Sequence, residues 1–154
     1  MTTRSRRPPR DPLHALLSFV YAIITNDMVS ALEGVGLDPA VGFLHVDRPG
    51  RPTLALDLVE EFRTLVADRL VLSLINLKQV QVTGLDSQPG GAVLMTEATR
   101  RTVLTALTQR KREEVTHPLL GGKVTIGLLP HLQARLLARH IRGDLEDYPA
   151  LVIK

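Results

Sequence analysis

The stretch "LHALLSFVYAIITNDMVSALEGV", residues 13–35, decides the fold class. Its apolar side chains recur every three or four positions, which is the spacing of one face of a helix. They are Leu13, Leu16, Leu17, Val20, Ile23, Ile24, Val29 and Leu32. Few polar residues interrupt the segment, so it predicts a deeply buried helix or a pair of helices. "GVGLDP", residues 34–39, predicts its end because Gly and Pro terminate helices.

The composition agrees with a helical core. The chain has 154 residues, the size of one domain, and 44% of them are hydrophobic, so we expect it to fold. Only 3% are aromatic and there is no Trp. A core of Leu, Val, Ile and Ala suits packed helices better than a sandwich of aromatic-rich strands. The scarcity of rings also argues against base stacking on an aromatic platform.

Further elements follow along the chain. Residues 1–12 predict an extended basic arm or linker, and residues 13–154 predict one mainly α-helical domain. Three more helices are expected, at about 53–76, 96–115 and 129–141, with Thr53 able to cap the first of them. "VQVTGLDSQPGGAVLM", residues 80–95, predicts a small β-hairpin because two apolar runs flank a cluster of turn residues.

The absence of cysteine limits the chemistry that the chain can perform. Disulfides and cysteine-bound zinc are excluded. A metal ion would have to be held by His, Asp, Glu, carbonyl groups or water, and this donor set favours Mg²⁺ or Mn²⁺.

Charge and hydropathy bear on location and partners. No uninterrupted run of about 18 apolar residues occurs and the N-terminus lacks the apolar core of a signal peptide, so the sequence predicts a cytoplasmic protein without a membrane span. The net charge is +3, and basic residues gather in residues 4–10 and in "RKRE", residues 110–113. Such runs are a weak indication of nucleic-acid binding, and charge alone favours a solvated arm or helix face.

A second stretch, "VGFLHVDRPGRPTLALDLVEEFR", residues 41–63, carries the candidate chemistry. On an α-helix, Asp57 and Glu60 share a face, which is expected to avoid the core. His45, delivered by the preceding apolar run, adds a nitrogen ligand, so the three side chains could hold a divalent ion. Arg63 could then steady a phosphate. The alternative is a solvated helix face, which the spacing alone favours.

The other histidines are weaker candidates. His14 lies in the apolar helix, where we expect a hydrogen-bonded core or interface histidine. His117, next to Pro118, is expected in a loop. His131 and His140 are nine residues apart and lie on opposite sides of an ideal helix, so they are not expected to form a ligand pair.

Several separated blocks resemble one known family. They are "RRPPRDPLHALLSFVYAII", "ALEGVGLDPAVGFLHVDRPGRPTLALDLVEEFR", "DRLVLSLIN" and "HLQARLLARHIRGDLEDYPAL". Together they are similar to the C-terminal helical domain of the CRISPR-associated integrase, the metal-dependent DNA endonuclease of spacer acquisition in antiviral defence, and they look like its subtype I-C branch. The resemblance runs from about residue 6 to residue 154.

The resemblance implies a site and partners. The family's histidine ligand corresponds to His45 and its acidic ligand to Glu60, with Asp57 as an auxiliary acid. Arg63, and with it Arg48, stands where a DNA-contacting residue is expected. Mg²⁺ or Mn²⁺ would be the cofactor. The implied partners are DNA, a second copy of the chain and a small partner subunit.

Departures from the family leave the activity open. The family's first ligand, a Glu in an E-G motif before the "RRPPR" segment, and its N-terminal β-rich dimerisation domain are both expected to be missing. Glu33 is a weak candidate for a substitute. The chain is therefore expected to be a truncated nuclease or integrase domain with an incomplete metal site. The alternative is a non-catalytic helical fragment that binds DNA or protein.

Overall fold

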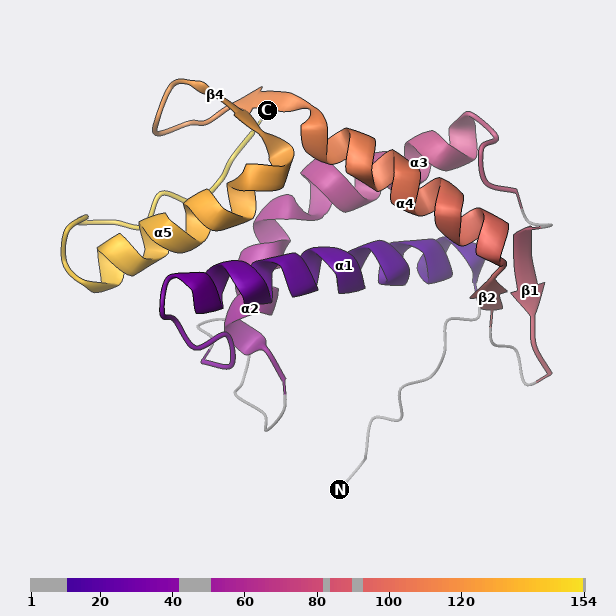
Figure 1. The fold of residues 1–154 in the computed structure, drawn as a ribbon, viewed down its shortest axis with the longest axis horizontal. Helices are drawn as coiled ribbons and strands as arrows, with labels where there is room; N and C mark the ends of the chain where they lie inside the picture. The colour runs from indigo at the N-terminus through magenta and orange to yellow at the C-terminus, as the bar shows by residue number, and fades with distance from the viewer. Residues whose placement is uncertain (1–10, 42–50, 82–83, 90–92, 154) are drawn as a thin grey trace.

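The computed structural model describes residues 11–41, 51–81, 84–89 and 93–153. The predicted arm, apart from its last two residues, and the predicted positions of His45 and Arg48 lie outside these residues. Within them, the chain is mainly α-helical with two small antiparallel sheets, as the sequence predicts. Figure 1 shows the order of the elements, with α1 crossing the molecule below α3 and α4.

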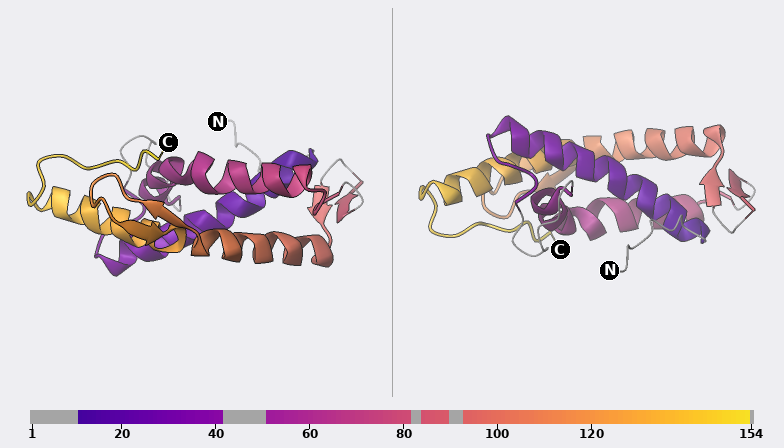
Figure 2. Two further views of the ribbon diagram at one scale, coloured as in Figure 1. Left: turned by 90° about the horizontal axis from the view of Figure 1, so that it is seen from above. Right: turned by 90° about the horizontal axis from the view of Figure 1, so that it is seen from below.

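Helix α1, Pro12–Gly34, is one continuous helix rather than a pair. Its buried side chains keep the predicted spacing: Ala15, Leu16, Val20, Ile24, Met28, Ala31 and Leu32. It contacts α2, α3, α5 and the β1–β2 hairpin, so it forms the centre of the core. Figure 2 shows α3 and α4 side by side with α1 crossing them. Gly36, two residues after the end of α1, has a backbone φ of +79°, which glycine adopts without strain.

The predicted helix at 53–76 is helical throughout but changes type three times. It comprises an α-helix, α2, Thr53–Val59; a 3₁₀ turn, η1, Glu60–Phe62; a π-helix, η2, Arg63–Asp68; and a second α-helix, α3, Arg69–Asn76. A 3₁₀-helix has 3.0 residues per turn, and in a π-helix the backbone hydrogen bonds join residues i and i+5. An α-helical wheel, with 3.6 residues per turn, therefore does not describe the whole segment. The predicted helical span is therefore confirmed, but the assumption of α-helical geometry throughout it is wrong.

The helix boundaries agree with the sequence where capping is local. Helix α4, Glu97–Arg112, begins after Thr96, whose hydroxyl accepts a hydrogen bond from the Thr99 amide at 3.2 Å, and it ends three residues earlier than predicted. Helix α5, Leu129–Ile141, has the predicted bounds. Thr53 does not cap α2. It is the first helical residue, and its hydroxyl donates to the carbonyl of Ala40.

Two hairpins flank α4. Strands β1, Leu85–Ser87, and β2, Val93–Met95, pair antiparallel, which confirms the predicted hairpin. Strands β3, Glu114–Thr116, and β4, Lys123–Thr125, form a second hairpin that the sequence did not reveal. A 3₁₀ turn, η4, Ile126–Leu128, then leads into α5.

The length and composition of α1 would allow it to cross a membrane. This corrects the expectation that no segment qualifies, because that expectation required an uninterrupted apolar run. A core helix meets the same criteria, and α1 packs seven side chains into the interior. The property is therefore weak evidence for a membrane span.

Candidate metal and DNA site

Four polar side chains meet where α1 passes the η1–η2 segment. The Tyr21 hydroxyl donates to Asp68 Oδ1 at 3.4 Å, which links α1 to the end of η2. Arg63 Nη1 lies 3.6 Å from Glu60 Oε2, and the side chains of Arg63 and Glu60 are 57% and 53% exposed. We call this set, Tyr21, Glu60, Arg63 and Asp68, the outer cluster. It presents a solvent-accessible carboxylate beside a guanidinium.

The outer cluster is electrostatically coupled. Partial burial raises the pKa of Tyr21, and the Asp68 carboxylate raises it further, while the Arg63 guanidinium acts in the opposite direction. The pKa of Arg63 is also raised, chiefly by Tyr21 and then by the carboxylates of Glu60 and Asp68. Tyr21 therefore stays protonated and Arg63 charged near neutral pH. The sequence analysis did not assign Tyr21 to the site, because its partners lie more than 35 residues away in the chain.

Asp57 corrects the predicted geometry of the acids. Asp57 was expected to avoid the core together with Glu60. It lies in α2 and is only 8% exposed. Asp57 is buried because α2 is packed on nearly all sides, with six of its seven residues buried, whereas Glu60 begins the next turn and is exposed. Glu60 is therefore the outward-facing acid of the two.

The donor chemistry fits a hard divalent ion only in part. Asp57 and Glu60 supply carboxylate oxygens, the ligand type that Mg²⁺ and Mn²⁺ prefer. In the part of the chain that the structure describes, no group of three His, Asp or Glu side chains could enclose an ion. His45, the predicted third ligand, and Arg48, the predicted DNA contact, lie outside that part. The described residues thus supply carboxylates of the right chemical type but no complete set of metal ligands.

Glu61, the neighbour of Glu60, belongs to a different environment. Its Oε1 accepts a hydrogen bond from the Tyr148 hydroxyl at 2.6 Å. Its Oε2 accepts from Gln133 Nε2 and from the Leu151 amide, both at 2.9 Å. Gln133 is fully buried on α5, and its Oε1 lies 2.8 Å from Nε2 of His117. We call Glu61, His117, Gln133 and Tyr148 the inner network.

The hydrogen bonds of His117 determine which of its two ring nitrogens carries the proton. Its Nδ1 accepts hydrogen bonds from the amides of Leu119 and Leu120, so Nε2 must carry the proton that is donated to Gln133. His117 lies in a loop, as predicted; the loop joins β3 to β4, and His117 is only 1% exposed there. His14 is the reverse case: its side chain is 73% exposed and its Nδ1 lies 3.0 Å from the carboxylate of Asp11. The expectation of a core or interface role finds no support among the contacts of the described residues.

Comparison with known proteins relates the sequence of this chain to a family. A family model described as "CRISPR associated protein Cas1" matches residues 1–109. The chain is 60% identical over 146 residues to the CRISPR-associated endonuclease Cas1 2 of Rhodospirillum rubrum, covering 95% of this chain and 42% of that protein. It is 50% identical over 151 residues to the endonuclease Cas1 of Leptospira interrogans, covering 98% of this chain and 59% of that protein.

Solved structures show the same fold. A casposase bound to integration product matches with a TM-score of 0.84 and 25% identity, covering 96% of this chain and 42% of that one. A Cas1 protein from Thermotoga maritima matches with a TM-score of 0.79 and 29% identity, covering 91% and 43%. The chain thus spans less than half the length of the first of these relatives and of both structures. The family match extends over most of the chain, and we conclude that the chain belongs to the Cas1 family.

Proposed function

We propose that this chain is the helical catalytic part of a metal-dependent DNA endonuclease and integrase that acts in CRISPR spacer acquisition, of the subtype I-C kind. The observation that supports this most strongly is the family match over residues 1–109, because it includes the His45–Arg63 stretch and the elements that carry the outer cluster. The reaction would be attack of a DNA 3′-hydroxyl, or of water, on a phosphodiester. We further propose that the protein works in the cytoplasm.

The proposed site residues have two roles, metal binding and contact with DNA phosphates. His45 and Glu60 would hold Mg²⁺ or Mn²⁺, with Asp57 as the auxiliary acid. When bound, the ion supplies Lewis-acid stabilisation of the charge that develops on phosphorus. Glu60 is suited to ligation because its carboxylate is exposed, and Arg63, 3.6 Å from it, orients that carboxylate. Arg63 and Arg48 would also contact DNA phosphates through charge-assisted hydrogen bonds.

The proposed assembly follows from the family. Partners would be DNA, a second copy of the protein and a small partner subunit. Since the described residues include no complete set of three ligands, we propose that His45 and a further acid complete the site.

Metal binding tests the proposal. Titration of Mn²⁺ by calorimetry would compare wild type with His45→Ala and Glu60→Gln. Glu97→Gln is the matched control, because Glu97 is also exposed and paired with an arginine on its own helix. We expect wild type and Glu97→Gln to bind alike, and the two site variants to bind at least about tenfold more weakly. Equal binding by all four proteins, or none by wild type, would refute the metal site.

Activity separates the two functions considered. Strand joining on a labelled branched DNA substrate, with Mn²⁺ present, is expected for wild type and not for Glu60→Gln. If wild type binds DNA with a strong salt dependence but joins and cleaves nothing, the chain is a non-catalytic DNA-binding module.

A further inference from the structure

The π-helix η2 is the least expected element of the fold. The apolar spacing of residues 53–76 predicts a continuous α-helix, yet residues 63–68 adopt i to i+5 bonding. Such bonding is rare and is frequent at functional sites, and it places one more residue in the turn than an α-helix does. The residues after the turn are therefore rotated, by about 100°, from where a continuous α-helix would put them. Something outside the segment must stabilise this arrangement.

Arg110, in the last turn of α4, contacts the π-helix directly. Its Nε and Nη2 both donate to the carbonyl oxygen of Leu65, at 3.2 and 2.7 Å, and its Nη1 donates to the carboxylate of Glu113. The Arg110 side chain is only 18% exposed. Hydrogen bonds from a charged guanidinium are stronger than those between neutral groups, and the fork fixes geometry as well as distance. Arg110 thus holds one carbonyl of the π-helix, 45 residues away in sequence.

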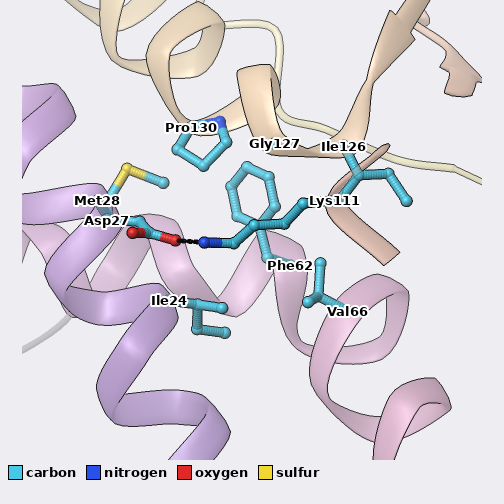
Figure 3. A pocket seen from close by; sticks show the side chains of 9 residues that line it. All are labelled: Ile24, Asp27, Met28, Phe62, Val66, Lys111, Ile126, Gly127 and Pro130. Carbon is cyan, nitrogen blue, oxygen red and sulfur yellow. Dashed lines mark hydrogen bonds and ion pairs between the residues drawn. The ribbon is translucent and has the colours of Figure 1, made fainter. Parts of the chain in front are cut away.

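Lys111, the next residue, contacts α1, the helix that carries Tyr21. Its Nζ donates to the carboxylate of Asp27 on α1 (Figure 3). The pair lies at a small cavity of about 20 Å³, which Phe62 and Val66 of the η1–η2 segment also line. Gly127 packs so closely that a Cβ there would lie 3.2 Å from the carbonyl oxygen of Lys111. Two successive residues of α4 therefore contact the two elements that meet in the outer cluster.

We propose that Arg110 is a positioning residue that keeps η2 in its π-helical form, so that Glu60, Arg63 and Asp68 face Tyr21 on α1. The proposal rests on the proposed function, since it assigns Arg110 a role in presenting Glu60 to the metal. Without the guanidinium, the segment relaxes toward the continuous α-helix that its sequence favours. Asp68 then turns away from Tyr21, and Arg63 leaves its position beside the Glu60 carboxylate, which loses the cation that orients it.

The basic run "RKRE" thereby acquires a different role from the one expected. A solvated face or a nucleic-acid contact was considered for residues 110–113, but Arg110 and Lys111 direct their charges to other parts of this chain. Arg112 is exposed and lies outside this arrangement.

Tyrosine NMR provides a test that does not depend on activity. The chain contains two tyrosines, so ¹³C labelling of tyrosine gives two resonances, and Tyr148→Phe assigns that of Tyr21. The variants are Arg110→Met, which keeps the length and loses the donors, and the control Arg101→Met on the exposed face of the same helix. We expect the pKa of Tyr21 to fall toward about 10 in Arg110→Met and to stay raised in Arg101→Met.

The same two variants are titrated with Mn²⁺. Arg110→Met is expected to bind at least about tenfold more weakly than Arg101→Met, the usual loss when a residue that orients a ligand is removed. If Arg110→Met does not melt cooperatively, Arg110→Lys is used with the same expectations, because lysine keeps the charge but not the fork. An unchanged Tyr21 titration in the folded variant would overturn the proposal. If wild type binds no Mn²⁺, the proposed function fails, while the Tyr21 comparison still decides the role of Arg110.

Discussion

Glu60 and Glu61 are adjacent in the chain and have opposite environments. The carboxylate of Glu60 is exposed and lies near a single cation, Arg63, at 3.6 Å. The carboxylate of Glu61 accepts hydrogen bonds from Tyr148, Gln133 and the Leu151 amide. A carboxylate whose oxygens are already satisfied inside the protein is poorly available to an ion, whereas an exposed one can exchange water for a ligand. The outer cluster is therefore suited to binding and the inner network to stability.

The largest expected loss of stability follows from a substitution in the inner network. Glu61→Ala removes the acceptor for three donors. Gln133 keeps its bonds to the Tyr148 hydroxyl and the Pro149 carbonyl, whereas the Tyr148 hydroxyl and the Leu151 amide lose their acceptor. Each unsatisfied buried group costs about 1–3 kcal/mol, so we expect a loss of at least about 3 kcal/mol in the free energy of unfolding. Urea denaturation measures this loss.

Glu60→Ala is the matched variant for that measurement. An exposed surface substitution usually changes stability by about 0.5 kcal/mol or less. Equal destabilisation by the two substitutions would remove the distinction between the outer cluster and the inner network.

His117→Ala sharpens the comparison at the far end of the inner network. The substitution leaves Gln133 Oε1 and the amides of Leu119 and Leu120 without their partner. We expect a loss of about 2 kcal/mol, again by urea denaturation. Substitution of His14, which is exposed, is the control and should have little effect. A stable His117→Ala protein would mean that water replaces the imidazole at no cost.

High pH should weaken the inner network through Tyr148. Burial, then the charge of Glu61 and the hydrogen bond to it, raise the pKa of Tyr148 far above its ordinary value of about 10. Above pH 10 the unfolded chain releases this proton and the folded chain keeps it, so stability falls as pH rises. The expected slope is about 1.4 kcal/mol per pH unit.

Stability curves between pH 9 and pH 11 measure this slope, and Tyr148→Phe should remove most of it. Tyr21, whose pKa is also raised, chiefly by partial burial and then by the Asp68 carboxylate, is expected to contribute the remainder. A slope that persists unchanged in Tyr148→Phe would contradict the assigned cause.

The smallest expected effect on the fold is at Arg63. Arg63→Gln should leave the unfolding midpoint nearly unchanged, because the side chain is exposed and its ion pair is with the exposed carboxylate of Glu60. It should reduce the slope of log K against log salt for DNA binding by about one, the signature of one lost phosphate contact. Fluorescence anisotropy at several salt concentrations measures this slope, and an unchanged slope would exclude Arg63 from the DNA surface.

Local patterns predicted most of the helices. The spacing from Leu13 to Leu32 located α1, and the hydroxyl of Thr96 marks the start of α4 as its sequence position suggests. The β1–β2 hairpin was recognisable from its turn residues. The β3–β4 hairpin was missed because each of its strands has one apolar residue, Val115 or Val124, so no apolar runs flank its turn residues.

Long-range contacts explain what the sequence could not predict. The π-helix depends on Arg110, which lies 45 residues from Leu65. The inner network joins Glu61 to Gln133, 72 residues apart. Asp57 was placed on the solvent face because its helix was expected to be amphipathic, whereas six of the seven residues of α2 are buried by contacts with the rest of the fold. Glu60 was placed correctly on an exposed face, whereas the structure does not test His45 or Arg48.

The central claim is that Glu60, and not Glu61, presents its carboxylate to a divalent ion. Crystals of the protein grown with Mn²⁺ would test it through the anomalous scattering of the metal. The account predicts a peak at coordination distance from the Glu60 carboxylate, with Glu61 still bound to Tyr148 and Gln133. A peak on Glu61, or a fully occupied Mn²⁺ site remote from Glu60, would contradict it.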